Sequence, residues 1–186
     1  YFVIEKNFKK LSKDIMWGRL DLVLTKPMDS QFLVSVGEFR LEDIARVLIG
    51  IGLLAYSLYK LHVVIHIFQI PIFVLFILLS MTIVYSLWFM LTTLSIWLIN
   101  VFNLYELFIH LTGLTRYPLE ILSYLNKYLM YVVLPLVVVT TVPAQIALQK
   151  INISLMLWAC IIAIVLFVIS RKFWQFALRY YTSAGG

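Results

Sequence analysis

Charged residues are scarce in this 186-residue sequence: they make up 13% of it, whereas 63% is hydrophobic. A soluble domain of this size exposes much of its surface to water and cannot hide so much apolar side-chain area. The 15 lysines and arginines outnumber the 9 acidic residues, but they stand between the apolar stretches and near both ends rather than along one face. The composition therefore predicts an integral membrane protein, and it argues against nucleic acid as a partner.

Residues that commonly build catalytic or metal sites are equally sparse. The single cysteine, Cys160, stands inside an apolar stretch and excludes an internal disulfide. The sequence has no glycine-rich phosphate loop, so we expect the chain to bind no nucleotide cofactor and to be no enzyme. His62 and His66 share a helix face, but no third ligand is near and we expect no metal site. The later apolar stretches carry no charge, which disfavours an ion-coupled carrier.

The apolar stretches predict an all-α protein with a bundle of four transmembrane helices. Residues 61–105 carry no charge. One helix of that length would be roughly 67 Å long at about 1.5 Å per residue, more than twice the bilayer core of about 30 Å. The stretch must fold back, and the break from His66 to Pro71 separates a span near 45–67 from one near 71–97. Uncharged stretches give further spans near 127–149 and 152–171. We expect all four spans to be helices, because lipid offers no hydrogen-bond partners to backbone N–H and C=O groups.

Lysine and arginine also predict the orientation. Of these 15 residues, only Lys60 and Lys150 fall near one side of the membrane, and the others precede the first span, separate the second from the third or follow the fourth. Both ends are therefore expected in the cytoplasm, with the chain in the inner (plasma) membrane. The predicted organisation is a cytoplasmic segment at 1–44, a transmembrane domain at 45–174 and a cytoplasmic tail at 175–186.

The segment before the first span has an amphipathic helical pattern. Apolar residues follow one face and lysines the other: Ile4, Phe8, Leu11, Ile15 and Leu22 against Lys6, Lys9, Lys10 and Lys13. Such a helix lies on the inner membrane surface or is the end of a span that runs into the cytoplasm. Trp17-Gly18 permits a bend, and Lys26-Pro27 ends a second, short helix. Anchoring to lipid and docking on a cytoplasmic partner both fit this pattern.

Two later stretches differ from simple spans. Residues 100–124 are too polar to cross a membrane and too apolar for a free loop, which favours an interfacial helix, either as a simple connection or as a functional contact. The third span contains Pro135 and Pro143, and proline removes a helix hydrogen bond. We expect a kink at Pro135 and a break near Pro143, with a re-entrant segment after it and threonine hydroxyls bonded to the freed carbonyls. A merely kinked helix is the alternative.

Four ordered motifs extend across nearly the whole chain. They are G-R-L-D-L-V-L-T-K-P at 18–27, R-Y-P-L-E at 116–120, the prolines Pro135 and Pro143, and R-K-F-W-Q-F-A-L-R-Y-Y-T-S-A at 171–184. The first is similar to G-x-L-D-x-x-L-x-[RK]-P and the last to R-x-F-W-x-x-A-L-x-x-Y-x-S-A. Together these motifs resemble the permeases of the ABC-2 transporter family. The resemblance implies a six-span fold, so that two spans would be missing before Tyr1.

The resemblance also implies a function. Permeases of this kind work as homo- or heterodimers in the lipid bilayer, and separate cytoplasmic subunits bind and hydrolyse ATP with Mg²⁺. It implies an ATPase-coupling element made of Gly18, Arg19, Leu20, Asp21, Leu24, Lys26 and Pro27, with Leu20 and Leu24 as apolar contacts. It further implies a cytoplasmic loop at Arg116, Tyr117 and Pro118, and a re-entrant outer gate with Pro135, Thr140, Thr141 and Pro143.

The expected function is export of an apolar or amphiphilic substrate, because the spans offer aromatic and methionine side chains rather than fixed charges. Two other classes of function stay open at this point. One is a membrane scaffold or immunity protein that transports nothing, and the other is a channel.

Overall fold

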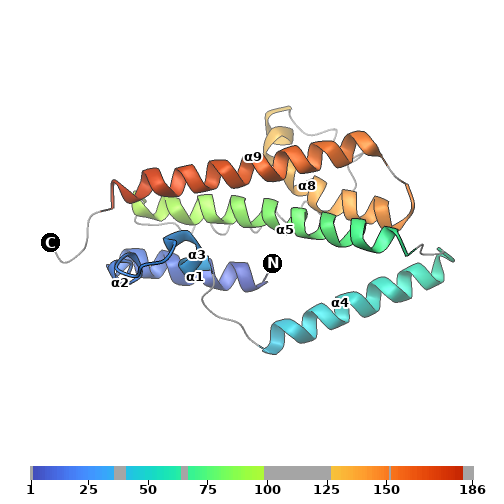
Figure 1. The fold of residues 1–186 in the computed structure, drawn as a ribbon, viewed down its shortest axis with the longest axis horizontal. Coiled ribbons are helices and arrows are strands. Elements are labelled where there is room, and N and C mark those ends of the chain that lie inside the picture. The colour runs from blue at the N-terminus through green and yellow to red at the C-terminus, as the bar shows by residue number, and fades with distance from the viewer. Residues whose placement is uncertain (1, 36–40, 64–66, 99–126, 151, 182–186) are drawn as a thin grey trace.

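The computed structural model describes residues 2–35, 41–63, 67–98, 127–150 and 152–181 (Figure 1). These ranges are helical and contain no strand, as the sequence predicts. The elements are α1 (Phe2–Met16), α2 (Asp21–Leu24), α3 (Ser30–Ser35), α4 (Leu41–Lys60), α5 (Gln69–Thr93), the short 3-10 helix η1 (Leu94–Ile96), α8 (Lys127–Ala147) and α9 (Ile153–Leu178).

Helices α5, α8 and α9 form the main body of the fold. They pack against one another, with α5 and α9 pointing the same way and α8 running in the opposite direction (Figure 1). Two helices in the described ranges are long and apolar enough to cross a membrane: Gln69–Ile96, which is α5 with η1, and Ile153–Leu178. They coincide with the predicted spans near 71–97 and 152–171, and the chain is a helical membrane protein.

The other two predicted spans also fall on helices, α4 and α8, although their passage through a membrane stays a prediction. Helix α4 is packed far less than the main body. Its side chains from residue 44 to residue 57 are all exposed, and Leu58 is buried near its end. Large apolar side chains are exposed along α5 and α9 as well. Lipid accommodates such surface without the free-energy cost that water would impose.

The buried residues form two clusters along the main body. The aromatic cluster is made of Phe8, Leu11, Ile15, Leu20, Trp88, Phe89, Leu136 and Trp174. The aliphatic cluster is made of Phe76, Ile83, Val138, Val142, Ile146, Ala159 and Ala163. In the aromatic cluster, α1 and the residues after it pack against the later halves of α5 and α9. The aliphatic cluster joins α5, α8 and α9 at the other end.

The amphipathic helix predicted at the start of the chain is α1, and three residues of its apolar stripe face protein, whereas Leu22 lies beyond α1 and is exposed. Phe8, Leu11 and Ile15 are buried in the aromatic cluster. The ring of Phe8 lies 5.6 Å from that of Phe89 in an edge-on contact. Helix α1 runs alongside the later half of α5 in the same direction (Figure 1). This arrangement fits the end of a span better than a helix lying on the membrane surface.

Candidate functional site

The residues of the implied ATPase-coupling element, Gly18 to Pro27, lie in the tip segment, which we define as residues 17–35 at one end of the helical body (Figure 1). Gly18 has a φ of 67°, in the left-handed region that glycine adopts without strain. Its N–H donates to the carbonyl of Ile15 at 3.2 Å, and the N–H of Arg19 donates to the carbonyl of Asp14 at 2.8 Å. These bonds end α1 and turn the chain. The bend predicted at Trp17-Gly18 is therefore present.

The tip segment has an exposed face and a buried face. Leu22 is 70% exposed and Leu24 is 38% exposed, so both present apolar surface outward. The exposed residues of the tip segment are Trp17, Arg19, Leu22, Leu24, Thr25, Lys26, Pro27, Met28, Asp29 and Phe32. Leu20, by contrast, is completely buried in the aromatic cluster. Contrary to the prediction, its side chain has no surface to offer a partner.

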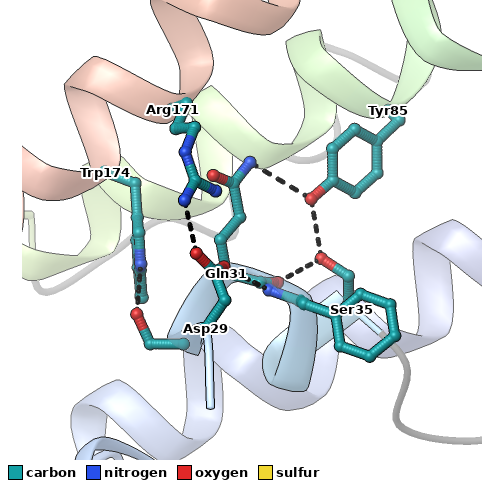
Figure 2. Close-up of polar contacts among 8 residues, drawn as sticks. Asp29, Gln31, Ser35, Tyr85, Arg171 and Trp174 are labelled. Carbon is teal, nitrogen blue, oxygen red and sulfur yellow. Dashed lines mark hydrogen bonds and ion pairs between the residues drawn. The ribbon is translucent and has the colours of Figure 1, made fainter.

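Asp29 connects the tip segment to α9 (Figure 2). One carboxylate oxygen accepts the N–H of Phe32 at 3.0 Å and so caps α3. The other accepts a hydrogen bond from the guanidinium of Arg171 at 2.5 Å. The bond from Arg171, with that from Phe32 second, lowers the pKa of Asp29 below its ordinary value of 3.8. Both side chains are more than a third exposed, so water screens this ion pair, and its main effect is to fix position.

Trp174 makes a second connection between the tip segment and α9. Its indole Nε1 donates a hydrogen bond to the hydroxyl of Ser30 at 3.0 Å (Figure 2). The indole is 1% exposed, and its ring meets that of Phe89 edge-on at 5.2 Å. A buried tryptophan needs an acceptor for its N–H, so Ser30 satisfies a group that would otherwise be costly to bury.

A closed set of hydrogen bonds ties α3 to α5 (Figure 2). Gln31 Nε2 donates to the hydroxyl of Tyr85 at 3.2 Å, and Ser35 Oγ donates to the carbonyl of Gln31 at 2.6 Å. The hydroxyls of Ser35 and Tyr85 are 2.7 Å apart. Each hydroxyl has a single proton, so Tyr85 is the donor in that last contact. Asn7 Nδ2 adds a bond to the carbonyl of Ser35 at 3.1 Å, which brings α1 into the network.

The predicted gate residues lie on α8, which is continuous from Lys127 to Ala147 and contains both prolines. The break predicted near Pro143 is therefore wrong, and the re-entrant segment predicted after it stays a prediction. Because Pro143 has no N–H, the carbonyl of Val139 loses its helical partner, and Ser80 of α5 donates to it at 2.9 Å. A neighbouring helix, rather than a threonine hydroxyl, satisfies this carbonyl. The hydroxyl of Thr140 donates to the carbonyl of Val137 at 3.2 Å.

Several predicted residues lie outside the described residues. They include the whole 100–124 stretch with Arg116, Tyr117 and Pro118, the histidine His66, and the last residues of the closing motif from 182 onward.

The connections to α5 and α9 were not foreseen from the sequence. Arg171 and Trp174 belong to the closing motif, so the motif marked them without showing what they contact. Nothing in the sequence around Gln31 or Tyr85 indicated a role for either residue. An aspartate just before a serine and a short apolar run could have been read as a helix cap, but its partner is 142 positions away in the sequence.

Comparison with known protein families matches residues 1–185 to the family described as "ABC-2 family transporter protein". None of the curated proteins and none of the solved structures compared with the chain matches it. The family match covers nearly the whole sequence and agrees with the helical body and its two long apolar helices. Members of this family are membrane components of transporters, are not themselves catalytic and generally work with an ATP-binding subunit. The chain therefore belongs to the ABC-2 transporter family.

Proposed function

We propose that this chain is the permease subunit of an exporter driven by a separate cytoplasmic ATPase, and that the ATPase docks on the tip segment. The observation that carries the proposal is the group of exposed apolar side chains Leu22, Leu24 and Met28 at one end of the body. These three side chains stand in the sequence close to the exposed cations Arg19 and Lys26, and this combination fits a protein surface that has an apolar groove and an acidic rim.

The length of α9 supports a position of the tip segment outside the hydrocarbon layer. From Ile153, where the helix begins, to Arg171 it rises about 27 Å at roughly 1.5 Å per residue, close to the bilayer core of about 30 Å. Arg171 is thus at the membrane boundary, and it contacts Asp29 of the tip segment. The excess of lysine and arginine on this side favours the cytoplasm, so both ends of the described chain would be cytoplasmic.

The chemistry of the tip segment specifies what the ATPase surface must offer. Protruding leucines fit a shallow apolar groove, and the exposed Arg19 and Lys26 fit an acidic rim around it, which would favour encounter and orientation. ATP and Mg²⁺ would be bound by the partner. Closure of two such ATPase subunits would then push the tip segments of two permease chains, identical or related, that face each other in the bilayer.

The proposed cargo is an apolar or amphiphilic molecule that leaves the cell. A cavity of ≈ 200 Å³ lies at the end of the body opposite the tip segment, lined by Leu54, Leu58, Gln69, Ile70, Phe73, Ile146 and Ala147. Its lining is apolar apart from one amide, which suits such a molecule. The cavity adjoins the last turn of α8, so we assign the outer gate to the part of α8 that contains Thr140, Thr141 and Pro143.

Co-purification tests the docking assignment. The chain would be co-expressed with candidate ATP-binding subunits from the same genome, and the double variant Leu22→Ser/Leu24→Ser is expected to lose the subunit that the wild type retains. Ile153→Ser is the matched control, because Ile153 is equally exposed but lies at the start of α9, away from the tip segment. Equal retention by the double variant and the wild type would refute docking through these leucines.

Activity measurements separate the proposed function from the other two classes. A permease stimulates ATP hydrolysis by its bound ATPase when cargo is added to proteoliposomes, whereas a scaffold leaves the hydrolysis rate unchanged. A channel passes current across a planar bilayer without ATP.

A further inference from the structure

The tip segment is connected to α9 at several points. Asp29 contacts Arg171, and Ser30 accepts the indole N–H of Trp174 (Figure 2). Leu20 shares the aromatic cluster with Trp174, and Tyr181, just beyond α9, packs against the same cluster. Leu20, Asp29 and Ser30 of the tip segment thus contact residues 171–181, which are the last turns of α9 and the three residues after it.

Helix α4 is the next long helix in the sequence, and it packs against the main body much less than the tip segment does. Its side chains are exposed from residue 44 to residue 57, and burial begins at Leu58, near its far end. A displacement of the tip segment would therefore reach the bundle through side-chain contacts with α5 and α9 more directly than through the chain that leads into α4.

Helix α9 is suited to carry a displacement over its full length. It has no glycine or proline between Ile153 and Leu178, so it lacks the usual sites at which helices kink, and it is about 39 Å long at roughly 1.5 Å per residue. Its other end contributes Ala159 and Ala163 to the aliphatic cluster, together with Val142 of α8. Helix α8 differs, because it contains two prolines.

We propose that α9 moves together with the tip segment as one rigid body, and that Asp29, Ser30, Arg171 and Trp174 are the positioning residues that hold the two together. The proposal rests on the proposed function, because the displacement comes from the docked ATPase, and it names the helix that receives it. Movement of α9 would shift the aliphatic cluster at the opposite end and bend α8 at its prolines, which precede the cavity-lining residues Ile146 and Ala147 on that helix.

The single cysteine reports on this movement without any engineering. Cys160 lies on α9, one position after Ala159, and is partly buried against the aliphatic cluster. If α9 shifts relative to α5 and α8, the access of a thiol reagent to Cys160 must change.

The test uses the complete complex of the chain with its ATP-binding subunit in phosphatidylcholine nanodiscs. The rate at which N-ethylmaleimide alkylates Cys160 is measured by peptide mass spectrometry, with and without ATP and orthovanadate. In the wild type we expect nucleotide to change this rate. The variants Asp29→Asn and Trp174→Phe should each weaken the response, and the two combined should abolish it, while co-purification of the ATP-binding subunit stays at the wild-type level.

Two controls separate positioning from general damage. Lys172→Gln removes an exposed cation one position after Arg171 and should leave the response unchanged. The variant Arg171→Gln removes the same ion pair from the side of α9 and leaves the Asp29 cap of α3 in place, so it should weaken the response as Asp29→Asn does. A full nucleotide response in the combined variant would overturn the proposal, and so would a wild-type complex in which nucleotide leaves Cys160 unaffected. Absence of any bound ATP-binding subunit would instead overturn the proposed function together with it.

Discussion

Ser80 provides a direct test of how this fold accommodates a proline in the middle of a helix. The carbonyl of Val139 lacks its usual helical donor because Pro143 has no N–H, and the hydroxyl of Ser80 donates to it instead. In Ser80→Ala this carbonyl is left without a donor at a buried helix interface. An unsatisfied buried polar group costs about 1–3 kcal/mol, so we expect a loss near 2 kcal/mol in the free energy of unfolding.

Thermal unfolding in detergent measures this loss. A thiol-reactive fluorophore labels the single cysteine, Cys160, which is partly buried against the aliphatic cluster, as that cluster opens. For a chain of this size about 1 kcal/mol corresponds to a shift of roughly 2–4 °C in Tm, so the Tm of Ser80→Ala should fall by about 4–8 °C. Ser86→Ala is the control on the same helix. Ser86 donates to the carbonyl of Thr82, which keeps its backbone donor, so we expect a much smaller shift.

The second half of the test is a rescue. Pro143→Ala returns an N–H to α8 at the position that faces the carbonyl of Val139. In the Ser80→Ala background it should therefore recover most of the lost Tm, whereas alone it should be neutral or stabilising, because a carbonyl can accept two hydrogen bonds. Strictly additive effects of the two substitutions would refute the reasoning, since they would show that Ser80 and Pro143 do not act on the same carbonyl.

Three further predictions use the same unfolding assay. Tyr85→Phe should cost about 1–3 kcal/mol because the buried amide of Gln31 loses its acceptor, and adding Gln31→Met should recover part of that loss. Asp29→Asn should lower the Tm by its full amount at pH values above the ordinary pKa of 3.8, and this effect should vanish as the pH falls through the lowered pKa of Asp29. The reason is that only the carboxylate accepts both hydrogen bonds. A Tm difference between wild type and variant that persists in strong acid would contradict this. Ala163→Leu should destabilise by about 1–3 kcal/mol through overpacking, whereas Ile164→Leu, on the exposed side of α9, should have little effect.

The sequence alone determined the class of protein and the positions of the long helices. The length of a stretch, its apolar character and its lack of charge can be read directly from the sequence. A stretch that is apolar over the thickness of a bilayer is predicted to be a span, and α5 and α9 therefore fall where they were predicted. The bend at Gly18 could also be predicted, because glycine is the residue that tolerates a left-handed backbone. The ordered motifs indicated the family for the same reason, because each motif is a run of consecutive residues that can be recognised without knowing its three-dimensional contacts.

Only the tertiary structure decided which faces meet. An apolar stripe satisfies lipid and protein equally, so periodicity could not show that α1 packs on α5 or that Leu20 points inward. The donor for the carbonyl freed by Pro143 depends on which helix lies beside it, and that helix carries Ser80. The pairing of Asp29 with Arg171 depends on how distant segments pack. Contacts of this kind are set by packing between helices, and no local pattern in the sequence encodes them.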